Sequence, residues 1–178
     1  MLVVLVSLTF FFGALILAFG LRIQQQGTWE RFQTPSILWL GTGLLLLSSW
    51  TLEAARRALR RALVVIYRGR LLATIVLAVL FLCVQAVSAR DLIAQGVAAA
   101  ANPHGSAFYL FMGIHGAHLT GGIAWIGYLR SHSKRLFKGT ETDLRHHRRT
   151  LSAAALYWHF MGALWVVLYY FLRRWTAG

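Results

Sequence analysis

Long apolar runs separated by short, mostly basic segments dominate the sequence. Each run approaches the roughly 20 residues that an α-helix needs to cross the hydrocarbon core of a bilayer. None shows the alternation of a membrane β-strand, and an isolated strand cannot satisfy its backbone hydrogen bonds in lipid. The pattern therefore predicts an all-α, polytopic membrane bundle with five transmembrane helices. We expect the spans near residues 2–21, 36–55, 71–89, 107–129 and 151–172.

The first run begins at Met1 without a basic segment in front of it and reaches Leu21 before its first charge, Arg22. This order favours a retained span over a cleaved signal peptide. No internal repeat or linker stands out along the chain. We therefore expect residues 1–178 to form a single membrane domain.

Composition strengthens the membrane interpretation. The chain is 58% hydrophobic, and 18 Lys and Arg against 5 Asp and Glu leave a net charge of +13. A basic excess of this size can indicate nucleic acid as a partner. Here the charges cluster at the ends of apolar runs, where anionic lipid head groups attract them, so we expect phospholipid and no nucleic acid.

The basic residues also predict an orientation. Thirteen of the 18 Lys and Arg fall in the connections between the second and third runs and between the fourth and fifth. With five spans, both connections lie on the same side as the N-terminus. Because cytoplasmic loops carry the excess of Lys and Arg, we expect a cytoplasmic N-terminus and an extracytoplasmic C-terminus.

Two basic clusters are candidates for contact with lipid or with another subunit. Residues 56–66 contain paired arginines at a four-residue interval, which favours a helix that continues past the membrane along the cytoplasmic surface. The cluster sets the orientation of the chain, or it forms a specific contact with anionic lipid or a neighbouring subunit. The same contact is expected at the start of the last run. The two clusters are Arg56, Arg57, Arg60 and Arg61, and His146, His147, Arg148 and Arg149.

Three histidines lie inside the runs: His115, His118 and His159. His115 and His118 are three residues apart and share a helical face, which is also the spacing of a metal or haem pair. No carboxylate or thiol in the middle of a span completes such a site. We therefore expect structural histidines, hydrogen-bonded between helices, and no metal or cofactor in this chain. Four glycines near these histidines predict close approach of a neighbouring helix: Gly113, Gly116, Gly121 and Gly122.

Catalytic groups are scarce elsewhere too. The lone cysteine, Cys83, excludes an intrachain disulfide and a multi-cysteine metal site, and its apolar surroundings predict a packing residue. All five acidic residues lie at span ends or in connections, which argues against paired catalytic carboxylates or a proton relay through the membrane. These are Glu30, Glu53, Asp91, Glu141 and Asp143.

Three stretches resemble subunit III of the haem-copper respiratory oxidases. The segment from His115 to His118, with Gly113 and Gly122 beside it, is similar to that family's Gly-Phe-His-Gly-Leu-His motif. The last run carries a Tyr-Trp-His-Phe motif that is similar to the family's last helix. The connection before the fourth run also resembles the family. The motif and connection residues are Tyr157, Trp158, His159, Phe160, Trp165 and Tyr169, and Gln85, Asn102, Pro103, His104, Gly105 and Ser106.

This resemblance implies a five-helix, non-catalytic subunit of a cytochrome c or quinol oxidase in a prokaryotic inner membrane. Members of the family pack against the catalytic subunit, subunit I, hold lipid, and support proton uptake and turnover stability. The haem and copper of such a complex belong to the catalytic subunit. Where the family carries acidic residues, this chain has Ser7, Ser88, Ser152 and Gly162.

Two alternatives remain open at this point. One is an accessory membrane subunit of a nitric oxide reductase. The other, from a different class, is a small haem- or metal-binding membrane enzyme that uses His115, His118 and His159.

The last two runs are expected to pack on each other through a motif of histidines and aromatic residues. In the last run, His159 and Trp165 are six residues apart, so they cannot share a helical face. We expect His159 to point into the bundle, because a buried imidazole needs a partner, and Trp165 to point toward lipid or the catalytic subunit. The full packing motif is His115, His118, Tyr157, Trp158, His159 and Trp165.

Overall fold

The structure, a computed structural model, describes residues 2–25, 36–97, 103–136 and 141–177. Within these ranges the chain forms five α-helices and no strand, which confirms the all-α prediction. The helices are α1 (Leu2–Gln25), α2 (Leu38–Arg60), α3 (Val64–Ala94), α4 (Pro103–Leu136) and α5 (Glu141–Ala177).

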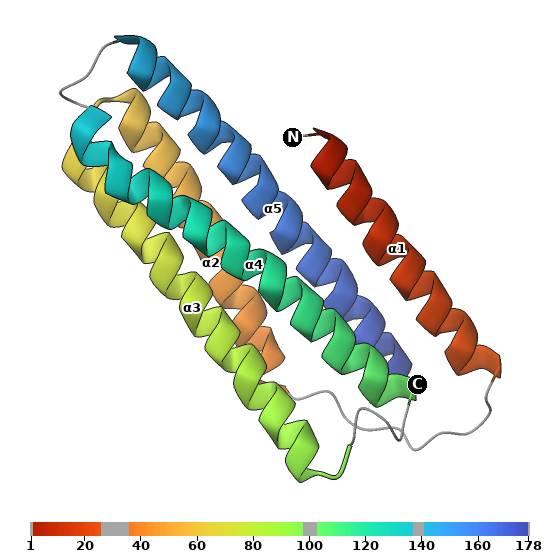
Figure 1. Cartoon of the computed structure of the whole chain (residues 1–178). Helices are drawn as coiled ribbons and strands as arrows, with labels where there is room; N and C mark the ends of the chain where they lie inside the picture. Colours follow the sequence, from red (N-terminus) through yellow and green to blue (C-terminus); the bar gives the residue numbers. More distant parts are fainter. Residues whose placement is uncertain (1, 26–35, 98–102, 137–140, 178) are drawn as a thin grey trace.

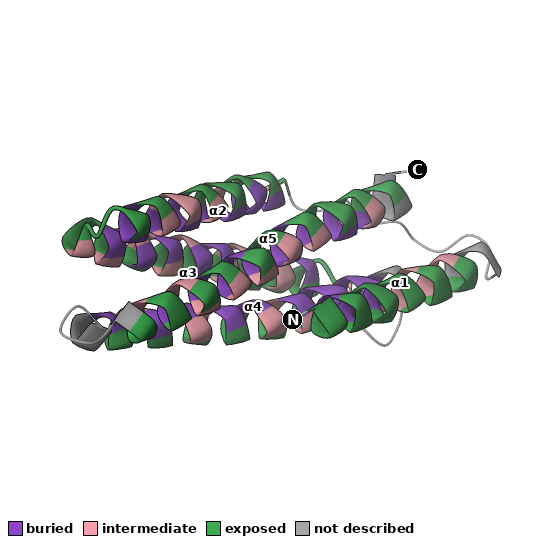
Figure 2. Ribbon diagram, turned by 90° about the horizontal axis from the view of Figure 1, so that it is seen from above, coloured by how far each residue is buried: buried purple, intermediate pink, exposed green. Residues whose placement is uncertain are grey.

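Helices α2 to α5 form the body of the bundle, and α1 packs at its edge (Figure 1). Helix α2 contacts α3 and α5, and α4 contacts α3 and α5, so the four helices close around one core. Helix α1 touches only α4 and α5 and buries few of its side chains (Figure 2). The exposed sides of the bundle are rich in Leu and Val, as expected where the surrounding solvent is lipid.

Each helix covers most or all of a predicted span, and α3, α4 and α5 extend beyond theirs at both ends. Within the described ranges, three segments are long and apolar enough to cross a membrane: Leu2–Arg22, Val64–Ala94 and Thr142–Arg174. Helix α2 carries four charged residues in its last two turns, and α4 is rich in Gly and His, which lowers their hydropathy. The count of five spans and the orientation of the termini therefore stay predictions.

The predicted continuous helix over residues 56–66 is wrong. Helix α2 ends at Arg60, and the chain turns through Ala62, whose φ of 55° is left-handed, before α3 begins. The turn is closed by the Leu63 amide, which donates to the Ala58 carbonyl at 3.0 Å. This reversal lets Leu59 and Tyr67, both fully or nearly fully buried, reach the same core from two helices. A helix running straight on would have placed Tyr67 outside the bundle.

Of the four glycines of α4 that were predicted to allow close helix packing, two do so. A Cβ atom at Gly122 would lie 3.0 Å from the Trp158 ring of α5, and one at Gly116 would lie 3.3 Å from Gln85 Oε1 of α3. The prediction of close approach therefore holds at these two positions. Nothing lies within 4 Å of a Cβ at the other two, Gly113 and Gly121.

Cys83 lies on the exposed side of α3, so the expectation of a packing role in the interior is wrong. Helix α3 buries Phe81, Gln85 and Ser88, which recur every three or four residues along one face. Cys83 follows Phe81 by two positions and therefore points to the opposite side. An apolar run by itself does not reveal which side of a membrane helix faces protein.

Replacing Gly122 by Leu should destabilise the bundle, because the new side chain would overlap the Trp158 ring. Overpacking of this kind costs about 1–3 kcal/mol. The matched control is Gly121→Leu, which adds the same side chain at the preceding residue, where the space is open. It should leave the stability of the bundle nearly unchanged. Thermal unfolding of both variants in detergent, followed by helical circular dichroism, measures the difference. Equal melting temperatures would show that α4 and α5 do not approach closely at Gly122.

Candidate functional site

A cluster of aromatic rings surrounds a histidine where α3, α4 and α5 meet. His115 of α4 is completely buried, with its ring centroid 5.3 Å from that of Trp165 on α5 and 6.0 Å from that of Phe81 on α3. The Phe81 and Trp165 rings meet edge to face at 4.9 Å. This geometry is the preferred one for aromatic pairs and joins three helices through ring contacts alone.

Neither ring nitrogen of His115 has a hydrogen-bond partner in the described part of the chain. The prediction that this histidine is hydrogen-bonded between helices is therefore wrong. The reason lies in its neighbours, because the faces and edges of Phe81 and Trp165 provide no strong acceptor toward the imidazole. A buried polar group left without a partner costs about 1–3 kcal/mol.

The His118 side chain also makes its hydrogen bond within its own helix and not to another helix. Its Nδ1 atom bonds to the Ile114 carbonyl of the same helix at 2.8 Å, and its ring meets Phe12 of α1 at 5.9 Å. The link to α5 comes instead from the backbone, since the Tyr157 hydroxyl donates to the His118 carbonyl at 2.9 Å. His118 and Tyr157 therefore join α4 to α5, but not through the imidazole.

Two tryptophans of α5 make the strongest polar links to α2. The Trp158 indole N–H donates to Ser48 Oγ, and the Trp165 indole N–H donates to Thr42 Oγ1, both at 3.0 Å. All four side chains are buried. Trp158 and Trp165 are seven residues apart, about two helical turns, so both rings lie on the face that looks toward α2.

His159 is exposed and Trp165 is 1% exposed, so the predicted inward histidine and outward tryptophan are reversed. The expectation that the two residues lie on different faces was correct. Trp165 takes the inner place because its large ring buries more apolar area than an imidazole and its single donor finds Thr42. An imidazole has two ring nitrogens that need partners, which makes it more costly to bury than an indole.

The structure does not bring the three intramembrane histidines together. His115 is enclosed by aromatic rings, His118 bonds to its own helix, and His159 faces outward. Among the residues that the structure describes, no three His, Cys, Asp or Glu side chains are placed to hold a metal ion.

The first basic cluster divides into two groups. Arg56 forms an ion pair with Glu53 at 2.6 Å and donates to Ser152 Oγ of α5 at 3.4 Å. Its charge is thus already matched within the chain. The other members are exposed at or next to the α2–α3 turn: Arg57, Arg60 and Arg61.

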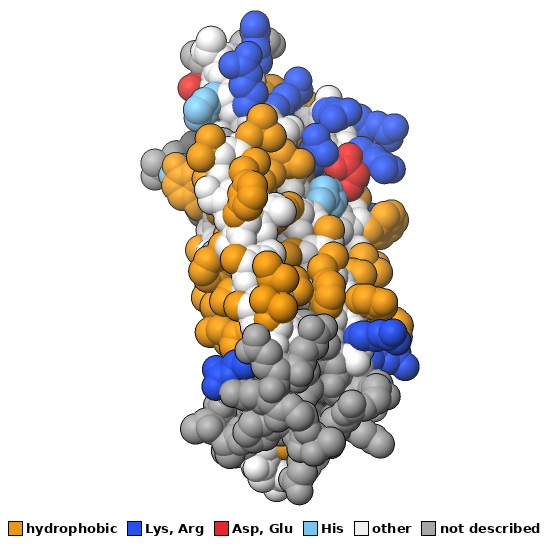
Figure 3. All heavy atoms as spheres, turned by 90° about the vertical axis from the view of Figure 1, so that its right-hand side faces the viewer, with side chains coloured by type: hydrophobic (Ala, Val, Ile, Leu, Met, Phe, Trp, Pro, Cys, Tyr) orange, Lys and Arg blue, Asp and Glu red, His pale blue; other side chains and the backbone are white. Residues whose placement is uncertain are grey.

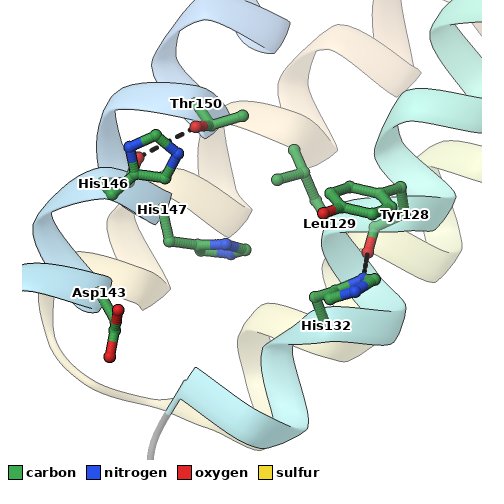
Figure 4. A pocket seen from close by; sticks show the side chains of 7 residues that line it. All are labelled: Tyr128, Leu129, His132, Asp143, His146, His147 and Thr150. Atoms are coloured by element: carbon green, nitrogen blue, oxygen red, sulfur yellow. Dashed lines mark hydrogen bonds between the residues drawn. The ribbon is translucent and has the colours of Figure 1, made fainter. Parts of the chain in front are cut away.

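The second basic cluster borders a pocket of about 300 Å³ between α4 and α5 (Figure 4). His147 is buried and its Nε2 atom bonds to the Tyr67 hydroxyl of α3 at 2.8 Å, so it acts as a cross-helix contact. His146 and Arg149 are exposed, and Arg148 is half-buried with its Nε atom enclosed. The pocket is lined by Tyr128, Leu129, His132, Asp143, His146, His147 and Thr150.

Several residues that hold the helices together were not singled out from the sequence. Thr42 and Ser48 accept the tryptophan bonds, and Thr51 of α2 bonds to Thr74 of α3 at 2.9 Å. Tyr67 was also missed. The seven-residue spacing of the two tryptophans was a signal for their shared face, but no pattern in α2 identified the hydroxyls that face them.

Of the connection before α4, Asn102 lies outside the described residues, as do the side chains of Pro103 and His104.

Comparison with known proteins gives a consistent picture. Residues 1–177 match the model of the family described as cytochrome c oxidase subunit III. A probable cytochrome c oxidase subunit 3 of Mycobacterium bovis is 31% identical over 174 residues, covering 94% of this chain and 83% of that protein. That of Mycobacterium leprae is 28% identical over 177 residues, with the same coverage. A probable quinol oxidase subunit 3 of Staphylococcus haemolyticus is 26% identical over 161 residues, covering 90% of this chain and 77% of that protein.

Replacing His115 by Leu should raise the thermal stability of the chain, because it removes two unpartnered polar atoms from an apolar cluster. The comparison variant is Trp165→Phe, which keeps an aromatic ring but loses the bond to Thr42 and should lower the free energy of unfolding by about 0.6 kcal/mol or more. Unfolding in detergent measures both. A marked loss of stability in His115→Leu would show that its ring has a partner after all, such as a bound water.

Proposed function

The chain belongs to the cytochrome c oxidase subunit III family and so to a haem-copper oxidase of the cytochrome c or quinol type, and we propose that it is the non-catalytic subunit that packs on the catalytic chain. In this role it holds anionic lipid beside the catalytic subunit and supports proton uptake and stability during turnover. The observation that carries the proposal is the family match over residues 1–177, together with a core in which tryptophans and histidines serve packing.

The proposed topology has five spans, with the N-terminus in the cytoplasm and the C-terminus outside it, in a bacterial inner membrane. Its support is the basic asymmetry of the sequence and the antiparallel order of α2 to α5 around one core. Under this topology the α2–α3 turn and the pocket between α4 and α5 both lie at the cytoplasmic end. The two basic clusters then meet the same leaflet.

The haem and copper of the complex are proposed to reside in the catalytic subunit. Two buried histidines of this chain already have other contacts: His115 packs against rings, and His147 bonds to Tyr67. The described acidic residues Glu53, Asp91 and Asp143 lie near the end of α2, near the end of α3 and at the start of α5, and Glu53 is already paired with Arg56. We therefore propose that this chain supports the catalytic subunit by packing on it and does not take part in the reaction.

The pocket between α4 and α5 is the better of the two proposed lipid sites. Its histidines, with the exposed Arg149 nearby, surround a cavity of a size that a phosphate head group can enter. Tyr128 and Leu129 give it an apolar side that can contact the start of an acyl chain. The α2–α3 turn contributes Arg57, Arg60 and Arg61 as surface cations at the same end.

Two measurements separate this function from its alternatives. Purification of the tagged chain in mild detergent, followed by identification of the catalytic chain that accompanies it, distinguishes an oxidase from a nitric oxide reductase. A visible spectrum of the isolated chain tests for a haem enzyme: a Soret band lost in His115→Ala would establish bound haem at the α4 histidines.

Deleting this chain should leave the oxidase with nearly its full initial rate but shorten its working life, since no reacting group resides here. Oxygen consumption by the purified complex measures the initial rate and the inactivation during sustained turnover in the same preparation. Re-expression of the intact chain is the control. An immediate loss of initial rate in a complex with a full complement of haem and copper would contradict a non-catalytic role.

Neutralising the basic residues at one end of the bundle should reduce the anionic lipid that co-purifies with the complex. The variant carries Gln at Arg57, Arg60, Arg61 and Arg149, because each such charge contributes about 1 kcal/mol near an anionic surface. Mass spectrometry of extracted lipid measures the loss. The matched control places Gln at four exposed arginines of the other end, Arg22, Arg90, Arg173 and Arg174, and should retain the lipid. Equal lipid content in all preparations would show that the basic clusters set the orientation of the chain and do not bind lipid specifically.

A further inference from the structure

One outward face of α5 combines apolar side chains with polar groups inside a membrane-spanning segment. Its exposed positions follow one another at intervals of three and four residues, as one side of a helix requires. The set lies within the candidate span Thr142–Arg174. The α5 face consists of Ser152, Leu156, His159, Ala163 and Val166.

The polar end of this face includes side chains from α2. Arg56 forms its ion pair with Glu53 at 2.6 Å and donates to Ser152 Oγ, which fixes the guanidinium across the α2–α5 seam. His159 lies near enough to Glu53 and Arg56 to interact with both electrostatically. Its ring is exposed. Figure 3 shows acidic and histidine side chains beside arginines at the boundary of the apolar band.

Ionisable groups that face hydrocarbon are costly, and in membrane proteins they face other protein or a water-filled cavity. His159 is exposed in the described chain, so neither α1 nor any other described helix covers it. Glu53 and Arg56 are likewise partly exposed, at 28% and 23% of their side chains. The surface therefore requires a cover from outside this chain.

Charge decides between anionic lipid and protein as that cover. Sites for anionic lipid present an excess of cations, whereas here the single arginine is matched by a carboxylate. What remains is the exposed imidazole of His159, set in an apolar stripe. A transmembrane helix of another subunit with one polar side chain opposite His159 provides both the bond and the apolar contact.

We propose that the α5 face, with Glu53 and Arg56 at its polar end, is the surface on which the catalytic subunit packs, and that His159 is hydrogen-bonded to a polar side chain of that subunit. This proposal rests on the proposed function and adds to it which side of the bundle meets the partner. It also accounts for the outward placement of a histidine and the inward placement of Trp165 in the same helix.

Photocrosslinking in the intact complex tests the proposal. Benzoylphenylalanine is placed at Leu156 on the α5 face or, as a matched control, at Leu80 on α3, two leucines that are 47% and 46% exposed. Val166 and Val79, each 44% exposed, form a second matched pair should the first disturb folding. The α5 probes should crosslink to the catalytic subunit, and the α3 probes should not.

Crosslinks from α3 alone, equal yields from both helices, or crosslinks from α5 to lipid only would overturn the assignment of this face while leaving the proposed function intact. Failure of the unmodified chain to co-purify with any oxidase would overturn both. The two failures are thus told apart by subunit identification in the same preparation.

The role of His159 is tested by two substitutions of similar size. His159→Leu should make the chain dissociate from the complex in detergent roughly fivefold more readily, the size of one hydrogen bond, and His159→Gln should restore retention. Because His159 does not contribute to the core, neither variant should change the thermal stability of the isolated chain. Retention unchanged in His159→Leu, or equally reduced in both variants, would overturn the hydrogen bond to the partner.

Discussion

A tryptophan can be buried in a dry interior only if its indole N–H finds an acceptor, and this requirement ties α5 to α2. Trp158 and Trp165 meet it with Ser48 and Thr42, two small hydroxyls on the opposite helix. Because each bond needs close approach, the two helices are fixed in register along two turns. The rest of the core then follows from these rings: Gly122 leaves room for Trp158, and Phe81 and His115 pack on Trp165.

The buried histidine of this bundle differs from the buried tryptophans in its hydrogen bonding. An imidazole has two nitrogens, and a neutral ring needs both a donor and an acceptor to be satisfied. The ring of His115 is buried, with a tilted contact to the Trp165 ring in place of hydrogen bonds, whereas His159 is exposed. The buried and the exposed histidine thus differ in what surrounds them, although both lie inside apolar runs of the sequence.

The sequence predicted the helical class, the approximate position of all five helices and the close approach at Gly122, since these depend on length, hydropathy and residue size. It failed where the result depends on which face of a helix meets protein. Cys83, His159 and Trp165 were each assigned to the wrong side. In a soluble helix the polar face marks the outside, but in lipid both sides are apolar, so periodicity carries little information about burial.

The prediction of a continuous helix over residues 56–66 was wrong for a different reason. Residues 56–66 have good local helix propensity, and only the tertiary gain from burying both Leu59 and Tyr67 favours reversing the chain there.

Polar links between helices are not spread evenly over the bundle. Thr51 and Thr74, Arg56 and Ser152, Tyr67 and His147, and Arg68 and Ser133 join α2, α3, α4 and α5 toward the end that carries the α2–α3 turn. Helix α1 is held mainly by ring contacts, Phe12 with His118 and Phe19 with Phe111. Ring contacts are less directional than hydrogen bonds, so α1 can shift without breaking the α2–α5 core. The four-helix core is therefore the part able to present a fixed surface to a partner, and the polar, uncovered seam between α2 and α5 lies on it.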